Sequence, residues 1–357
     1  MNWLLLFIPV ALALEHFHAQ DPWVFFAAGL AIVPAAALIV RSTEQIATYT
    51  GEAIGGLLNA SFGNAPELIV ALVALKAGLL DMVRAALVGG ILANLLLALG
   101  LSFLAGGLRY HVQTYNASAA RVYGSMTLLA ALSLMVPSAF SRLLAPGAPV
   151  REEALLNFGL ALVLLSAYGL YLLFQLKTHP DEFAGEPGKL APPEEAHQAR
   201  WSLPRALLSL LGASVLAAWM SEVLVGAAQG TGKALGMSEV FIGVVFLAIV
   251  GGAAGPPAAI VMARRDKMDL SMGIALGAAI QIALFVAPVL VLASYFIAPE
   301  PLRLSFSRLE VGAVFMAALI GAIVAGDGRS NWYKGVQLIA VYLMIALMFY
   351  FIPSEPK

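Results

Sequence analysis

The chain has 357 residues, of which 61% are hydrophobic and only 11% charged, and its mean hydropathy is +0.88. A soluble domain is nearer half apolar and a quarter charged, so this composition predicts a membrane protein. The formal net charge of −1, with no basic arm, excludes a nucleic-acid partner, and the lack of cysteine excludes disulfides, thiol catalysis and thiolate metal sites.

Eleven apolar segments follow one another along the chain, and we expect each to be a membrane helix. The first lacks a basic amino-terminal region and a small-residue cleavage site, so it is expected to be a short retained helix rather than a signal peptide. The sequence therefore predicts an all-α polytopic protein whose solvent is the lipid bilayer. The approximate spans are 3–15, 22–48, 52–78, 82–106, 118–137, 152–175, 204–228, 239–263, 270–297, 309–325 and 331–352.

One long polar stretch, residues 176–203, interrupts this pattern. It is rich in Pro, Glu and Gly, a composition that cannot bury a core and predicts a mobile linker, either a simple tether or a regulatory segment. It divides the chain into an extra first helix (1–20), a first five-helix repeat (21–175) and a second five-helix repeat (204–357). Lys and Arg are more frequent in the loops that share a side with the N-terminus. This bias predicts a cytoplasmic N-terminus and linker and a C-terminus on the opposite side.

The most informative residue of the third segment is Glu67. It lies deep in the apolar run 51–75, which carries no charge between Glu52 and Glu67. A carboxylate at that depth is costly, so it normally faces a water-filled cavity, a partner or an ion. Gly63 and Pro66 loosen the helix just before it, and the carbonyl groups freed there can bind a cation. This segment predicts the ion site of a transporter.

The two halves share a plan. Segment 52–106 has a Gly-rich broken span, a short basic turn and a run that begins at Gly89, and segment 239–297 repeats these features around 250–257. Five helices per repeat is an odd number, so the halves must insert upside down relative to each other. Inverted repeats place the substrate site at the midplane, where the broken helices meet, so Glu67 is expected beside residues 251–257. Close helix packing explains Gly89 equally well, but it does not explain the run 64–67.

Residues 51–69, Gly-Glu-Ala-Ile-Gly-Gly-Leu-Leu-Asn-Ala-Ser-Phe-Gly-Asn-Ala-Pro-Glu-Leu-Ile, closely resemble the first repeat signature of the Ca²⁺/H⁺ exchanger (CAX) branch of the cation/Ca²⁺ exchanger superfamily. Residues 267–270, 281–285 and 327–332 resemble further family motifs, and the resemblance covers nearly the whole chain. It implies a fold of one helix plus two inverted five-helix repeats. It also implies exchange of Ca²⁺ for protons by alternating access. By this resemblance Glu67 is the expected Ca²⁺ ligand. The other residues of the expected cation/proton site are Asn64, Gly63, Ala65, Gly251, Gly252, Gln281 and Asn94.

The second signature departs from the family, which usually reads Gly-Asn-Ala-Ala-Glu-His. This chain has Gly-Gly-Ala-Ala-Gly-Pro at 251–256, so the second carboxylate, the asparagine and the histidine are missing. Alanines at 278 and 279, and Gly90 and Ala93, also stand where the family usually has serines. Ca²⁺ takes about six to eight oxygen ligands and usually more than one carboxylate. Glu67 alone would face the ion with a single negative charge.

Three other carboxylates, Glu44, Glu52 and Glu222, are candidate accessory groups or proton-route residues; they could instead cap helices or pair with interfacial cations. No two histidines share a helix at metal-ligand spacing, so no zinc site is expected. No catalytic triad, P-loop or dinucleotide motif is present, which predicts a transporter without cofactor rather than an enzyme. Two alternatives remain open: transport of a monovalent cation such as Na⁺ or K⁺, and a scaffold that keeps the fold without transport.

Overall fold

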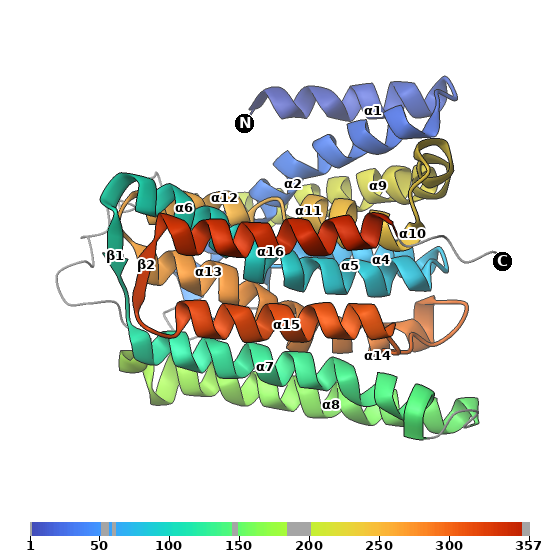
Figure 1. Cartoon of the computed structure of the whole chain (residues 1–357). Helices are drawn as coiled ribbons and strands as arrows, with labels where there is room; N and C mark the ends of the chain where they lie inside the picture. The colour runs from blue at the N-terminus through green and yellow to red at the C-terminus, as the bar shows by residue number, and fades with distance from the viewer. Residues whose placement is uncertain (1, 51–56, 59–61, 145–148, 184–200, 352–357) are drawn as a thin grey trace.

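The computed structural model describes residues 2–50, 57–58, 62–144, 149–183 and 201–351. These residues form a bundle of helices that run in roughly one common direction (Figure 1). Eight of the described helices are long and apolar enough to cross a membrane, and a bent pair, Glu239–Gly251 with Gly255–Arg264, can form a ninth span. The first predicted span is a shorter apolar helix, Trp3–His16. Of the third, the helix Ala65–Lys76 is described, whereas Glu52 lies outside the described residues.

The described elements keep the predicted order along the chain. In the first half they are η1 (Asn2–Leu6), α1 (Phe7–His16), α2 (Asp21–Thr50), α4 (Ala65–Lys76), α5 (Leu80–Leu92), η2 (Ala93–Ala98), α6 (Leu99–Tyr110), β1 (Val112–Thr114), α7 (Ala117–Ala139), η3 (Phe140–Leu144), α8 (Val150–Leu173), η4 (Phe174–Thr178) and η5 (Pro180–Glu182). In the second half they are α9 (Leu203–Leu235), α10 (Glu239–Phe241), η7 (Ile242–Leu247), α11 (Ala248–Gly251), α12 (Gly255–Arg264), α13 (Met268–Gln281), η8 (Ile282–Val286), α14 (Ala287–Ile297), α15 (Arg308–Ala325), β2 (Arg329–Asn331) and α16 (Trp332–Tyr350).

The two halves are inverted with respect to each other. The α6–α7 connection, which contains β1, lies at one end of the bundle, and its counterpart in the second half, the α14–α15 connection (298–307), lies at the other end (Figure 1). β1 pairs antiparallel with β2, so we call the first end the ribbon end and the second the opposite end. The fold is therefore one extra helix plus two inverted five-helix repeats.

The centre of the bundle is made by two equivalent spans, α5–η2–α6 and α13–η8–α14. They are the most deeply buried of the long apolar spans in the described part of the chain. Their side chains form one large apolar core with α7, α8 and α15, which includes Leu96, Phe103 and Leu284. A second core joins α1, α2 and α9 through residues such as Phe25 and Leu224. Helix α2 packs along α9, so the first helix of each repeat lies against its counterpart.

Both described borders of the predicted linker are packed against helices. At its start, the ring of Phe183 contacts the rings of Tyr123 and Tyr171, with centroids 5.6 and 6.4 Å away. The main chain at Glu182 accepts a hydrogen bond from Asn116 Nδ2 at 2.9 Å. Residues at the start of the predicted linker thus pack against α7 and α8, and a mobile polar linker remains a prediction. Residues 184–200 lie outside the described part.

At the other border, Trp201 stacks between two arginines, one from each repeat. Arg41 of α2 lies 5.0 Å and Arg205 of α9 lies 4.8 Å from the ring centroid. The Trp201 backbone N–H donates to Gln45 Oε1 at 2.9 Å, and Tyr49 Oη donates to the Trp201 carbonyl at 2.5 Å. These contacts fasten the start of α9 to the end of α2.

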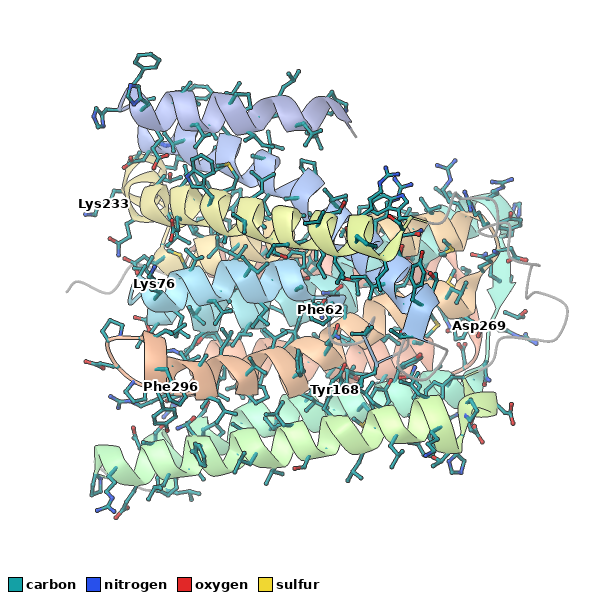
Figure 2. The ribbon with its side chains drawn as sticks, turned by 180° about the vertical axis from the view of Figure 1, so that it is seen from behind. Phe62, Lys76, Tyr168, Lys233, Asp269 and Phe296 are labelled. Carbon is teal, nitrogen blue, oxygen red and sulfur yellow. The ribbon has the colours of Figure 1, made fainter. Side chains whose placement is uncertain are left out.

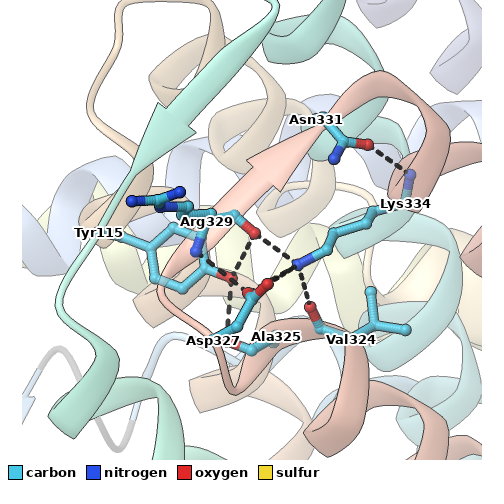
Figure 3. A network of polar contacts seen from close by, with 7 residues as sticks. All are labelled: Tyr115, Val324, Ala325, Asp327, Arg329, Asn331 and Lys334. Atoms are coloured by element: carbon cyan, nitrogen blue, oxygen red, sulfur yellow. Dashed lines mark hydrogen bonds and ion pairs between the residues drawn. The ribbon is translucent and has the colours of Figure 1, made fainter.

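A polar network holds the turn between α15 and β2 (Figure 3). Lys334 Nζ lies 2.6 Å from each carboxylate oxygen of Asp327 and donates to the carbonyl groups of Val324 and Arg329 at 2.9 and 2.7 Å. The ammonium group thereby satisfies a carbonyl at the end of α15. Partial burial raises the pKa of Asp327, but the hydrogen bond and charge of Lys334 and the Arg329 N–H outweigh it, so the pKa lies below its ordinary value.

The crossing of α5 and η7 requires glycine, which has no side chain. A Cβ atom at Gly89 of α5 would lie 2.0 Å from the Val244 carbonyl oxygen of η7. The same occurs on the other side of the crossing, where a Cβ atom at Gly243 would lie 2.5 Å from Ala85 Cβ. Glycines at such positions let two backbones touch. The counterpart of Gly89 in the second repeat is Gly277, where an added Cβ meets nothing within 4 Å.

We predict that Gly89→Ala destabilises the protein by about 1–3 kcal/mol or more, because the added methyl group must push apart two backbones. The matched substitution Gly277→Ala, in the other repeat, should be neutral or stabilising, since alanine favours a helix by about 0.5–1 kcal/mol over glycine. Thermal unfolding of the two purified variants in detergent measures the difference. Equal unfolding midpoints would show that the crossing tolerates a side chain.

We also predict that Asp327→Asn lowers stability at neutral pH. The lowered pKa of Asp327 means that its ionised form stabilises the fold above the unfolded pKa of about 4. This stabilisation is lost as the pH falls through the folded pKa, so the wild-type and variant unfolding midpoints should converge in acid. A difference that persists at the lowest pH would assign the effect to shape rather than charge.

Candidate cation site

The site is built where two broken helices begin. Helix α4 starts at Ala65 with Pro66 in its first turn and runs toward the opposite end. In the second repeat, the span bends by 60° between Gly251 and Gly255, and α12 then runs toward the ribbon end. Proline lacks an N–H group and is tolerated in a first turn, so it favours a new helix start at each break. The two half-helices therefore diverge from one central region.

Glu67 lies directly against the second break. A Cβ atom at Gly251 would lie 3.1 Å from Glu67 Cγ, and one at Gly252 would lie 3.4 Å from Glu67 Oε1. Glycine at these positions lets the backbone of α11 approach the carboxylate. The structure thus brings Glu67, Gly251 and Gly252 together, where the inverted-repeat plan places them. Glu67 itself is partly buried, and Asn64 and Ala65 just before it are buried.

A small cavity of about 20 Å³ adjoins Glu67. Its volume fits about one water molecule or a small ion. Glu67 is the single charged residue among the residues that line it. The other walls are apolar or backbone and come from α4, α5, η7, α11 and η8; they are Val70, Ala71, Ala74, Val83, Ala86, Leu87, Gly90, Leu247, Ala248, Ile282 and Val286.

Three of the predicted site residues are buried amides, and each donates a hydrogen bond through its nitrogen. Asn64 Nδ2 donates to the Ala278 carbonyl oxygen at 3.2 Å, and Asn94 Nδ2 donates to the Gly90 carbonyl oxygen at 2.9 Å. Gln281 Nε2 donates to Tyr168 Oη at 3.2 Å. Such bonds fix the side chains and leave amide oxygens as the groups suited to a hard cation.

Sequence reasoning missed Tyr168. It lies in α8, is buried, and joins Gln281 through its hydroxyl while its ring lies 5.6 Å from that of Phe285, centroid to centroid. Figure 2 shows it at mid-length of the bundle, at the level of Phe62. A single tyrosine in an apolar helix carries no signal of such a contact, because aromatic residues are common in membrane helices.

The two described accessory carboxylates, Glu44 and Glu222, do not line the cavity at Glu67. Glu222 of α9 is exposed and lies 3.8 Å from Lys76 Nζ at the far end of α4. Lys76 follows Glu67 by nine residues, which is roughly 13 Å along a helix axis. Both line a separate hollow of about 380 Å³. Glu44 is exposed near the end of α2, and Glu52 lies outside the described residues.

Gly255 stands where the family usually has its second carboxylate, and the space beside it is open. A Cβ atom at Gly255 meets nothing within 4 Å. In the part of the chain that the structure describes, no group of three His, Cys, Asp or Glu residues could hold a metal ion. A cation beside Glu67 would therefore depend on one described carboxylate, with amide and main-chain oxygens completing its shell.

Comparison with known proteins assigns the family. The family described as sodium/calcium exchanger protein matches residues 21–177 and 205–351. The Ca²⁺/H⁺ antiporter of Aphanothece halophytica is 40% identical over 370 residues, which cover 99% of this chain and 97% of that protein. The Ca²⁺/H⁺ antiporter ChaA of Bacillus subtilis is 38% identical over 344 residues, 96% of each chain.

A solved structure agrees with these relatives. The structure of native YfkE superposes with a TM-score of 0.82 at 34% identity and covers 97% of both chains. Sequence and fold thus match over nearly the full length of this protein. The chain belongs to the sodium/calcium exchanger protein family, in its Ca²⁺/H⁺ exchanger (CAX) branch.

Proposed function

We propose that this protein exchanges Ca²⁺ for protons across a membrane by alternating access, with Glu67 as the group that binds either the cation or the proton. The observation that carries the proposal is the position of Glu67, a carboxylate at the start of α4 that lies against the break between α11 and α12, beside a small cavity. Relatives that match nearly the whole chain are named Ca²⁺/H⁺ antiporters, which supports the same substrates.

Competition for one carboxylate couples the two fluxes. The ionised carboxylate of Glu67 binds the cation, and a proton on the same group removes the charge that holds it. The site therefore carries either a proton or a cation when it changes sides, and each ligand leaves when the other binds. Amide oxygens of Asn64, Asn94 and Gln281, with main-chain carbonyls near Gly63 and Gly252, are the proposed remaining ligands.

The proposed orientation places the ribbon end in the cytoplasm. Basic residues of the α12–α13 turn, the α6 terminus and β2 gather there, and an excess of Lys and Arg marks cytoplasmic loops. The N-terminus and the linker 176–203 then lie inside and the C-terminus lies on the other side. The proposed repeats are 21–175 and 204–357, which is supported by the two stretches that the family matches.

We predict that purified protein in sealed liposomes takes up Ca²⁺ when a pH gradient is imposed, and that Glu67→Gln abolishes this uptake. The amide keeps the shape of the side chain but cannot ionise, so neither the cation nor the proton can be exchanged. The variant should still fold, because a neutral amide costs less free energy to bury in the membrane interior than an ionised carboxylate. Ion-selective dyes report Ca²⁺ and proton movement in the same vesicles.

Matched controls define the result. Glu222→Gln removes an exposed carboxylate about one α4 length away and should retain uptake. If Glu67→Gln still exchanges ions and Glu222→Gln does not, the coupling carboxylate would be Glu222 of α9. Uptake of Na⁺ or K⁺ without Ca²⁺ would favour a monovalent transporter, and no flux of any ion would favour a scaffold. The names of the relatives support neither alternative.

A second prediction concerns the missing carboxylate. Gly255→Glu should raise Ca²⁺ affinity by at least about tenfold, or about 1.4 kcal/mol, because it adds a second charge and two ligand oxygens in open space. Adding Gly252→Asn and Pro256→His restores the usual family pattern. Position 252 is tight, since a Cβ atom there lies 3.0 Å from the Ala248 carbonyl oxygen. Calorimetric titration with Ca²⁺ measures the change.

The control for this titration is Gly255→Gln, which has nearly the same volume as the glutamate without its charge. An equal gain in both variants would assign the effect to packing. No gain in either, with tight binding in the original protein, would mean that main-chain and amide oxygens already complete the site.

A further inference from the structure

The cavity beside Glu67 is bordered on one side by a π-helical turn. Segment η8 (Ile282–Val286) follows directly on α13, and the Ala287 backbone N–H at its end donates to the Ile282 carbonyl oxygen, five residues back. A π turn is rare in proteins and occurs frequently at functional sites. Because the α-helical alternative is the commoner form, contacts from outside the helix are needed to maintain such a turn.

Two residues of η8, Ile282 and Val286, form part of the wall of this cavity. They are one turn apart, so they lie on the same face of the segment. Ile282 also faces Gly90 of the other central span, since a Cβ atom at Gly90 would lie 3.0 Å from Ile282 Cδ1. The position of η8 thus sets how close this wall comes to the space that adjoins the carboxylate of Glu67.

A tyrosine from a different helix holds the neighbouring face of the turn. Tyr168 of α8 is buried, and its hydroxyl oxygen accepts a hydrogen bond from Gln281 Nε2 at 3.2 Å. The Tyr168 ring also packs on the Phe285 ring, with 5.6 Å between the two centroids. Each of these two contacted residues directly precedes a residue of the cavity wall, Ile282 or Val286. Tyr168 therefore bridges the π turn beside the face that lines the cavity.

The first repeat has the same arrangement without this bridge. Segment η2 (Ala93–Ala98) is the π turn of the other central span, and α16 packs on it as α8 packs on η8. The amide of Asn94 donates to the Gly90 carbonyl oxygen of its own span at 2.9 Å. Tyr342 of α16 is buried like Tyr168, yet its hydroxyl has no hydrogen-bond partner within the described residues. The amide at one π turn is thus held from within its own span, and the amide at the other by α8.

Packing alone does not explain the hydroxyl group of Tyr168. A phenylalanine would fill the same space against Phe285 without bringing a polar group into an apolar core. Burial of a hydroxyl or an amide is costly unless each finds a hydrogen-bond partner, and here the two satisfy each other. The partner, Gln281, is a predicted residue of the cation site, so the bond fixes the direction of an amide that the site can use.

We propose that Tyr168 is a positioning residue that sets which cations the site accepts. Its hydroxyl and ring hold η8 in the π form, and η8 holds Ile282 and Val286 at the distance that suits an ion of the size of Ca²⁺. The same hydrogen bond keeps the nitrogen of Gln281 turned toward α8, so that the amide oxygen lies on the other side of the amide group. This inference rests on the proposed function, because it assigns a selectivity to the site that exchanges Ca²⁺.

Ion size is the property that such a wall distinguishes. Selectivity among hard cations depends on the size of the cavity, the number of ligands and their flexibility. Glu67 is the single charged residue among the residues that line the cavity, and its charge attracts all divalent cations alike. Sr²⁺ and Ba²⁺ carry the charge of Ca²⁺ but are larger, so a wall that is held in place penalises them more.

Tyr168→Phe tests the hydroxyl alone, since it keeps the ring and its contact with Phe285. The affinities of the purified protein for Ca²⁺, Sr²⁺ and Ba²⁺ are measured by calorimetric titration in detergent. We expect the preference for Ca²⁺ over Ba²⁺ to fall about fivefold, the equilibrium equivalent of one ordinary hydrogen bond. Tyr168→Leu, which also removes the ring, should lower this preference further.

The inverted repeats supply a matched control. Tyr342→Phe removes a buried hydroxyl without a described partner from the equivalent helix. It should leave the cation preference unchanged and leave stability unchanged or raised, because no hydrogen bond to a described group is lost. Val286→Ala widens the cavity directly, and it should lower the preference for Ca²⁺ over Ba²⁺ while Tyr168 is intact.

A double variant shows whether the tyrosine acts through the amide. If it does, Tyr168→Phe should cause little further loss of preference in a Gln281→Leu background, because the hydrogen bond is already missing. A role in folding alone would lower the thermal unfolding midpoint and the folded fraction of Tyr168→Phe. It would leave the ratio of the Ca²⁺ and Ba²⁺ affinities as it is in the unaltered protein.

An unchanged Ca²⁺ preference in folded Tyr168→Phe would overturn the proposal, as would a full additional loss in the double variant. If Tyr168→Leu fails to fold, Tyr168→Phe decides by the same criterion. Ion exchange in liposomes is measured separately. Binding with the expected preferences but without exchange would reject the proposed function and retain the role of Tyr168, whereas exchange with an unchanged preference in Tyr168→Phe would do the reverse. A protein that binds none of the three cations would reject both.

Discussion

The structure is organised around the cost of holding one carboxylate inside a hydrocarbon layer. Glu67 needs partners at that depth, and regular helices cannot provide them, because their carbonyl groups are already bonded. Two interrupted helices solve this problem, because the start of α4 lies against the break between α11 and α12. Gly251 and Gly252 then bring main-chain atoms to the carboxylate, which a side chain would keep away. The bundle of long helices around this point keeps water and lipid from the exposed backbone.

The second repeat retains the bend but not the acid. A site with a single described carboxylate has a different balance of charge from one with two, since a divalent ion is then only half neutralised. In the proposed site, oriented oxygens would make up this shortfall, and the amide nitrogens of Asn64, Asn94 and Gln281 are each held by a hydrogen bond. Fixed dipoles stabilise a cation without reorganising when it arrives, whereas free amides would lose conformational entropy on binding.

The sequence predicted those parts of the fold that depend on local pattern. Apolar runs gave the order of the helices, and Pro66 and the run 251–257 gave both breaks, because proline and glycine act on their own residue and its neighbours. The ribbon could not be predicted, since two three-residue strands have no periodicity to detect and pair across more than 200 positions. The same reason hid Tyr168, whose partner Gln281 lies on another helix. Glu222 was expected on the ion or proton route, but its role depends on where α9 lies relative to α4, which no local pattern contains.

The stacking of Trp201 between Arg41 and Arg205 has a consequence for how the two repeats stay associated. Each border of the linker is secured by its own contacts, and α2 packs along α9 independently of the segment between them. Closing a flexible loop costs free energy that grows only with the logarithm of its length, so lengthening the segment between the borders should weaken this association little. The length of the segment between the two borders can therefore vary while the packing of the two repeats stays the same.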